Sequence, residues 1–136
     1  MRILVVDDMP LMRHVLINML RKLEYSDIVE ATDGKQALEL LQSRHFDLVI
    51  SDLHMPKMSG KDLVSTMHND NKLKSIPVMI VTCEDNKEKI HELIKERIDG
   101  FIVKPFCLTT LEKQLKYIMA KQNSSQQQSQ VLESKA

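Results

Sequence analysis

The sequence has few of the residues that mark disulfide-bonded, zinc-binding or membrane proteins. Only two cysteines occur among its 136 residues, Cys83 and Cys107, and they form neither a CxxC pair nor a zinc-binding spacing. We therefore expect two free thiols, buried or half-buried, in a reducing cytoplasm. No apolar run approaches the roughly 18–20 residues that a membrane-spanning helix needs. The first residues also lack the pattern of a secretory signal peptide.

An excess of charge of either sign is also absent. Lysine plus arginine and aspartate plus glutamate number 19 each, so the formal net charge is zero. A protein that binds nucleic acid or a membrane surface through its overall field carries a basic excess. We therefore expect no direct nucleic-acid partner and no membrane partner. The hydrophobic share of 43% and the charged share of 28% are ordinary for one globular domain of this length.

Five short, nearly continuous apolar runs alternate with segments whose apolar residues recur every three to four positions. Such runs, without polar alternation, are typical of strands that are covered on both faces. The expected strands cover residues 3–6, 28–31, 48–50, 78–81 and 101–103. Glu30 interrupts the second run, and we expect this strand at an edge of the sheet.

The segments between the runs have the period of amphipathic helices. The expected helices cover residues 11–23, 37–41, 63–67, 90–98 and 108–119. Pro10, Asp33 and Ser59 supply helix-start signals. The alternation predicts a single α/β domain of (βα)₅ type over residues 1–121, with a doubly wound parallel sheet and helices on both faces. Residues 122–136 are rich in glutamine and serine, and we expect a disordered tail there.

Chemically active side chains follow the expected strands. In an open parallel sheet, ligands bind beyond the carboxyl ends of the strands, and the residues found there are Asp7 and Asp8, Asp52, Thr82 and Lys104. Two carboxylates about 4 Å apart repel by about 4 kcal/mol at an effective dielectric near 20, so three of them need a cation. Oxygen ligands favour a hard ion such as Mg²⁺, and Lys104 can neutralise an acid or hold a phosphoryl oxygen. For any single acid, the alternative is that it caps a helix or a loop.

These residues resemble a known family, the receiver domains of two-component response regulators. The resemblance rests on Asp7-Asp8, the stretch DLHMPKMSG from Asp52 to Gly60, Thr82 and the sequence Lys104-Pro105-Phe106. It covers residues 1 to about 121 and is strongest for stand-alone, chemotaxis-type (CheY-like) receivers. The resemblance implies a flavodoxin-like five-stranded sheet with the strand order 2-1-3-4-5.

The resemblance also implies a phosphoryl-transfer site. Asp52 would be the phosphoacceptor, which takes the group from a sensor histidine kinase, a phosphotransfer protein or a small phosphodonor. Asp7 or Asp8, or both, would hold Mg²⁺ together with Asp52 and the main-chain carbonyl of His54. In such a reaction the protein mainly positions groups and neutralises charge.

Further roles follow from the same resemblance. Thr82 and Lys104 would bind the phosphoryl oxygens. Phe101 stands where the family has a switch aromatic, and the alternative is an ordinary core phenylalanine. His54 and Glu84 would flank the path of the water that hydrolyses the aspartyl phosphate. Because histidine changes its charge near neutral pH, we expect the dephosphorylation rate to vary between about pH 6 and 8.

The implied protein is a signalling switch rather than an enzyme, although it assists its own phosphorylation and slow dephosphorylation. Its output would be a conformational change of the face formed by the fourth helix, the fifth strand and the fifth helix, where a downstream target protein would bind. Three departures from the family are present, and one of them is His54, two residues after Asp52, at a position that varies widely in the family. Cys83 replaces a very small residue after Thr82, and Arg97-Ile98 replaces a common Gly-Ala, which removes a left-handed glycine cap from the fourth helix.

Three other functions compete with this interpretation. A Mg²⁺-dependent phosphatase of the haloacid dehalogenase type needs Asp-x-Asp after a strand, whereas this chain has Asp52-Leu53-His54. A flavodoxin-like carrier needs a phosphate-binding loop after the first strand, where Asp7 and Asp8 would repel a phosphate. The third possibility is the N-terminal receiver part of a longer DNA-binding response regulator, with residues 122–136 as a linker.

Overall fold

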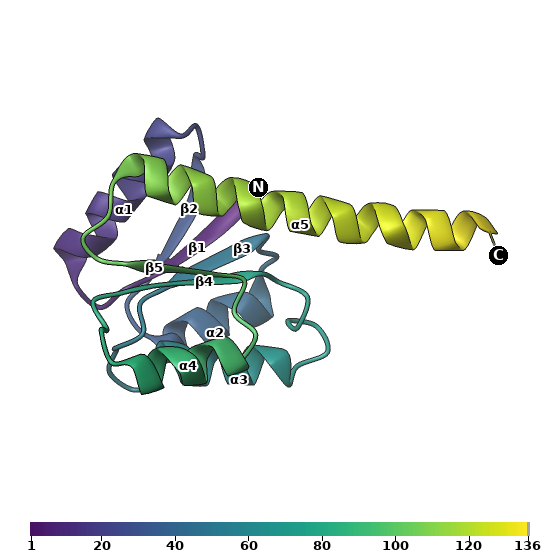
Figure 1. Ribbon diagram of the computed structural model, residues 1–136. Coiled ribbons are helices and arrows are strands. Elements are labelled where there is room, and N and C mark those ends of the chain that lie inside the picture. The colour runs from purple at the N-terminus through teal and green to yellow at the C-terminus, as the bar shows by residue number, and fades with distance from the viewer. Residues whose placement is uncertain (136) are drawn as a thin grey trace.

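Five parallel strands form one sheet in the computed structural model, which describes residues 1–135 (Figure 1). The strands are β1 (Arg2–Val6), β2 (Asp27–Ala31), β3 (Leu48–Ser51), β4 (Val78–Thr82) and β5 (Gly100–Val103). Their order in the sheet is β2-β1-β3-β4-β5, and every neighbouring pair is parallel. This confirms the predicted fold class and strand order. It also places β2, the strand with Glu30, at an edge as expected.

The described residues form five helices, and the first three begin where the start signals predict. The five helices are α1 (Pro10–Lys22), α2 (Gly34–Ser43), α3 (Gly60–His68), α4 (Lys87–Lys95) and α5 (Leu108–Lys135). The side chain of Asp33 accepts a hydrogen bond from the Gln36 amide at 2.8 Å, and Ser59 accepts one from the Asp62 amide at 3.1 Å. These bonds satisfy amide groups that have no partner within the first turn of a helix. Among the described residues, no helix is long and apolar enough to span a membrane.

The core lies on both faces of the sheet, with α1 and α5 against one face and α2, α3 and α4 against the other (Figure 1). The alternation is clear in β1, where Ile3 and Val5 pack under α1 and α5 while Leu4 and Val6 pack against the opposite layer. All four side chains are at most 1% exposed. Because both faces are covered, the strands are continuously apolar, as the sequence predicts.

The C-terminal segment differs from the expectation. The sequence analysis predicts a disordered tail over residues 122–136, but α5 continues as a helix to Lys135. This stretch contains neither proline nor glycine, so its composition supplies no signal to end the helix. Figure 1 shows this end of α5 extending beyond the sheet. The domain boundary at residue 121 stays a prediction, and residue 136 lies outside the described residues.

The expectation that the cysteines are buried or half-buried is wrong, because both are free and exposed. Cys83 directly follows β4, and Cys107 precedes α5, so neither side chain lies under the helices that cover the sheet. Hydrogen bonds from the side chain and backbone of Thr110 lower the pKa of the Cys107 thiol.

The left-handed turn after α4 is present although the glycine is not. Arg97 has a φ of 62°, and its amide donates a hydrogen bond to the carbonyl oxygen of Ile94 at 3.1 Å. A side chain with a Cβ atom in this conformation costs about 1 kcal/mol or slightly more. The departure noted in the sequence therefore leaves the turn in place, with backbone strain at Arg97.

We predict that Arg97→Gly raises the free energy of unfolding by about 0.5–1 kcal/mol, because removal of Cβ relieves more strain than the added freedom of the unfolded chain offsets. Urea denaturation measures the change. Arg97→Ala is the matched control, since it removes the guanidinium but keeps Cβ, and it should show no such gain. A glycine variant less stable than the alanine variant would contradict the prediction.

Candidate functional site

The register of the sheet brings the ends of four strands together. The amide of Asp52, directly after β3, donates to the carbonyl oxygen of Val6 at 2.9 Å, which sets Asp52 beside Asp7. The amide of Lys104, directly after β5, donates to the carbonyl oxygen of Thr82 at 2.9 Å. The strands are parallel, so all these side chains lie at one edge of the sheet. The structure thus confirms that the residues predicted from the strand ends converge.

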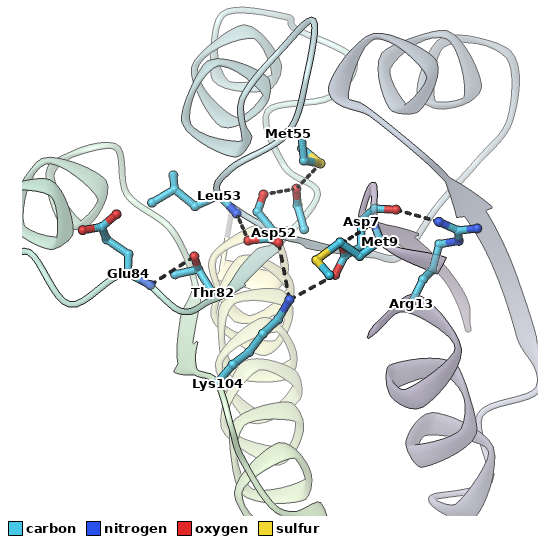
Figure 2. A network of polar contacts seen from close by, with 10 residues as sticks. Asp7, Met9, Arg13, Asp52, Leu53, Met55, Thr82, Glu84 and Lys104 are labelled. Carbon is cyan, nitrogen blue, oxygen red and sulfur yellow. Dashed lines mark hydrogen bonds and ion pairs between the residues drawn. The ribbon is translucent and has the colours of Figure 1, made fainter. Parts of the chain in front are cut away.

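Lys104 bridges two carboxylates at the centre of the site (Figure 2). Its Nζ lies 3.1 Å from Oδ2 of Asp7 and 3.4 Å from Oδ2 of Asp52, and its side chain is only 8% exposed. Burial lowers the pKa of this ammonium, but the hydrogen bond to Asp7 and the charges of Asp52 and Asp7 outweigh burial, so the pKa is raised. Lys104 therefore keeps its positive charge at neutral pH.

Three carboxylates face this one ammonium. Asp7, Asp8 and Asp52 each offer an oxygen, and these oxygens lie within 4.8 Å of one another. Both oxygens of Asp7 already have partners, because Oδ1 accepts from the Met9 amide at 2.9 Å and Oδ2 faces Lys104. Asp8 is exposed. A compact set of carboxylate oxygens with excess negative charge fits a hard divalent cation.

The backbone around Asp52 is held tightly by α3. A Cβ atom on Gly60 would collide with the carbonyl oxygen of Asp52, and the Gly60 amide donates to the carbonyl oxygen of Leu53 at 2.8 Å. The carboxylate of Asp52 accepts from the Leu53 amide at 2.6 Å, and the hydroxyl of Ser51 donates to the Asp52 carbonyl oxygen at 2.8 Å. Glycine at position 60 is therefore required for the start of α3 to lie against the backbone of Asp52.

Thr82 is buried at the same edge, and Phe101 lies on the same face of the sheet. The hydroxyl oxygen of Thr82 accepts a hydrogen bond from the Glu84 amide at 3.3 Å (Figure 2). Phe101 pairs in register with Ile80, two residues before Thr82, so the three side chains point to one face. The half-buried Phe101 packs against the core layer under α2, α3 and α4.

His54 and Glu84 form a pair across two neighbouring loops. Nε2 of His54 lies 2.6 Å from Oε2 of Glu84. The backbone amide of Asn86 first, and then His54, lower the pKa of the Glu84 carboxyl, with Lys89 at 3.9 Å adding to the effect. The Glu84 side chain is 10% exposed and the His54 side chain 57%. Glu84 therefore stays ionised at neutral pH and joins the loop after β3 to the loop after β4.

Sequence reasoning missed one contributor to the site. Arg13 on α1 donates to the carbonyl oxygen of Asp7 and to the carboxylate of Glu30, at 2.8 Å each. The available signal was Glu30, an acid inside an otherwise apolar strand. A sequence alone does not show which cation such an acid meets.

Comparison with known proteins identifies the family of this chain. The family model described as the response regulator receiver domain matches residues 3–116. The chain belongs to the response regulator receiver family. This confirms the resemblance stated from the sequence, and it favours the receiver over the phosphatase and the flavodoxin-like carrier.

Individual relatives of this receiver are chemotaxis proteins. The Chemotaxis protein CheY of Pseudomonas aeruginosa is 38% identical over 123 residues, which are 90% of this chain and 99% of that protein. CheY-3 of Vibrio cholerae is 42% identical over 115 residues, or 85% of this chain and 88% of that protein. The crystallised CheY4 of Vibrio cholerae is 33% identical with a TM-score of 0.78, covering 86% of this chain and 97% of that one.

A more distant solved structure shares the fold of this receiver. It is the receiver domain of a sensor histidine kinase from Pseudomonas aeruginosa, at 22% identity and a TM-score of 0.77, and it covers 86% of this chain and 96% of that one. That protein has a magnesium ion coordinated in its active-site cleft.

We predict that, without divalent cations, Asp8→Asn raises the free energy of unfolding of this receiver by about 1 kcal/mol, because it removes one of three mutually repelling charges from a partly screened position. Thermal unfolding in a chelating buffer measures the effect. Glu39→Gln, at an exposed position on α2, removes a charge outside the cluster and should have a much smaller effect. A loss of stability in Asp8→Asn would mean that the cluster is not repulsive in the resting protein.

Proposed function

We propose that this receiver is a phosphorylation-activated signalling switch of a two-component system, with Asp52 as the phosphoacceptor. The observation that carries the proposal is the pairing of Lys104 with Asp7 and Asp52 inside a cluster of three carboxylates. A carboxylate nucleophile beside a fixed ammonium and a cation site is the arrangement that phosphoryl transfer needs. The donor is a sensor histidine kinase or a phosphotransfer protein, which carries the group as a phosphohistidine.

In the proposed reaction a carboxylate oxygen of Asp52 attacks the phosphorus atom of the donor. A P–O bond to Asp52 forms as the P–N bond of the phosphohistidine breaks, and the released imidazole takes up a proton from solvent. Lys104 neutralises negative charge on the phosphoryl oxygens, and the Thr82 hydroxyl donates a hydrogen bond to one of them. The Thr82 oxygen accepts from the Glu84 amide in this structure, which leaves its proton available.

The cation of this site would be Mg²⁺, and Asp7 or Asp8, or both, would hold it together with Asp52 and the main-chain carbonyl of His54. The donor chemistry supports this choice, because Mg²⁺ takes oxygen ligands and is commonly bound through one or two carboxylates plus phosphate. The magnesium ion in the fold neighbour from Pseudomonas aeruginosa supports it as well. When bound, the ion supplies charge neutralisation for the transferred group.

The output surface is the face formed by α4, β5 and α5. Among the residues of these elements whose side chains the structure describes, three large apolar ones are exposed, Ile94 at 59%, Val103 at 47% and Tyr117 at 61%. Apolar exposure of this kind suits a protein partner, so the downstream target is a protein rather than nucleic acid. Phosphorylation would reach this face through Thr82 and the packing of Phe101. The proposal places the protein in the cytoplasm, as the sequence analysis expects.

We predict that Mg²⁺ plus a small phosphodonor adds one phosphoryl group to the wild-type protein and none to Asp52→Asn. The amide keeps the shape of the carboxylate but lacks its nucleophilic charge. Intact-mass spectrometry of the acid-labile adduct is the measurement. Asp33→Asn, which alters a helix cap away from the cluster, should still be labelled. Equal labelling of Asp52→Asn would refute the assignment.

We also predict that the His54–Glu84 pair lengthens the life of the aspartyl phosphate, because the joined side chains partly cover the path of the attacking water. Glu84→Gln and His54→Asn should each hydrolyse several times faster than wild type. As the sequence leads us to expect, the wild-type rate should vary between about pH 6 and 8, and it should vary less in either variant. Measurement of the rate of phosphate release at several pH values tests this. If the rates of all three proteins depend on pH in the same way, His54 has no role in the hydrolysis.

A further inference from the structure

Arg13 is the only described side chain that donates to the main chain of Asp7. Its Nη1 donates to the Asp7 carbonyl oxygen at 2.8 Å, and its Nε donates to Oε1 of Glu30 at 2.8 Å. The Arg13 side chain is only 12% exposed, whereas Glu30 is 45% exposed. The planar guanidinium therefore uses two of its edges at once and connects α1, the loop after β1 and the edge strand β2.

These bonds fix the backbone on both sides of Asp8. The peptide unit before Asp8 carries the Asp7 carbonyl that Arg13 binds. The peptide unit after Asp8 carries the Met9 amide, which donates to Oδ1 of Asp7 at 2.9 Å. With one peptide unit held on each side, the two backbone dihedrals of Asp8 have little freedom. The direction in which the exposed Asp8 carboxylate points is thus set by contacts that Asp8 itself does not make.

Of the three carboxylates, that of Asp8 depends most on the backbone for its orientation. Asp7 is 4% exposed and its carboxylate is fixed by Met9 and Lys104, and Asp52 is fixed by Leu53 and Lys104. The Asp8 carboxylate, in contrast, lies at the surface and has no hydrogen-bond partner among residues 1–123, whose side chains the structure describes. Outer-shell contacts that orient a metal ligand contribute to metal affinity.

We propose that Arg13, anchored by Glu30, is a positioning residue that aims the Asp8 carboxylate at the divalent cation. The inference rests on the proposed function, since it concerns the Mg²⁺ site of that switch. It also gives a role to the acid that interrupts the apolar pattern of β2. Arg13 makes no ion pair with any of the three carboxylates of the cluster, and it acts only through the peptide unit between Asp7 and Asp8.

Isothermal titration of the full chain with Mg²⁺ tests the proposal. Arg13→Met keeps the apolar stem and removes the donors, and it should weaken Mg²⁺ binding about tenfold or more, the usual cost of losing an outer-shell partner. The Mg²⁺ affinity of Arg13→Lys should lie between those of the wild type and Arg13→Met, because one ammonium can reach only one of the two acceptors. Glu30→Gln keeps an acceptor oxygen and should bind Mg²⁺ nearly as wild type does, whereas Glu30→Ala should weaken Mg²⁺ binding, but less than Arg13→Met does.

His14 supplies the matched control. It is the next residue on α1 and its ring lies 3.9 Å from the same oxygen of Glu30, but it is 63% exposed and makes no bond to Asp7. His14→Ala should bind Mg²⁺ as wild type does. Thermal unfolding of every variant, recorded without metal, identifies the fraction folded at the titration temperature.

A double-mutant cycle separates positioning from general support. If Arg13 acts through Asp8, then Arg13→Met should change the affinity of an Asp8→Asn protein by less than about twofold. Wild-type affinity in a folded Arg13→Met, or an undiminished effect in the Asp8→Asn background, would overturn the proposal while leaving the Mg²⁺ site intact. A wild-type protein that binds no Mg²⁺ would instead overturn the proposed function, and the positioning role with it.

Discussion

The contact between the Lys104 ammonium and the carboxylates of Asp7 and Asp52 organises this protein. It joins the end of β5 to the ends of β1 and β3, and therefore ties the edge of the sheet to its centre. It also leaves the cluster short of positive charge, since one ammonium faces three carboxylates. At separations under 5 Å, each unbalanced pair of charges costs on the order of 1–4 kcal/mol, depending on exposure. In the resting site, the ammonium therefore attracts the carboxylates while the carboxylates repel one another.

The buried sheet holds these mutually repelling side chains in place. Both faces are covered, and the residues that precede the site, such as Val6, Ser51 and Val81, are at most 2% exposed. Hydrogen bonds from Asp52 to Val6 and from Lys104 to Thr82 continue the ladder one step beyond the strands. The charged side chains therefore stand on a rigid base that does not relax to separate them. The free energy gained by burial in the core offsets the repulsion among the charges at this edge of the sheet, where the functional residues lie.

Sequence patterns predicted the parts of the structure that depend on local or periodic features. Continuous apolar runs located the strands, and the rule that ligands bind beyond strand ends located the cluster. Exposure of the cysteines was missed because burial ends abruptly at Thr82, one residue before Cys83. The bond from Arg13 to Glu30 was missed because it joins a helix to an edge strand 17 residues away. The left-handed turn at Arg97 was missed because the fold imposes it on a residue that does not favour it.

The loop after β4 shows how a local event at the site can reach α4. In the resting protein, the hydroxyl oxygen of Thr82 accepts the Glu84 amide, while the Glu84 carboxylate holds the Asn86 amide and His54. Asn86 caps α4 in turn, through bonds to the first amides of that helix. Under the proposed function, a phosphoryl group on Asp52 draws Thr82 toward it and weakens its bond to the Glu84 amide. The hydrogen bonds that link Thr82 to Glu84, Glu84 to Asn86 and Asn86 to the first turn of α4 then have to rearrange together, because each residue is bonded to the next.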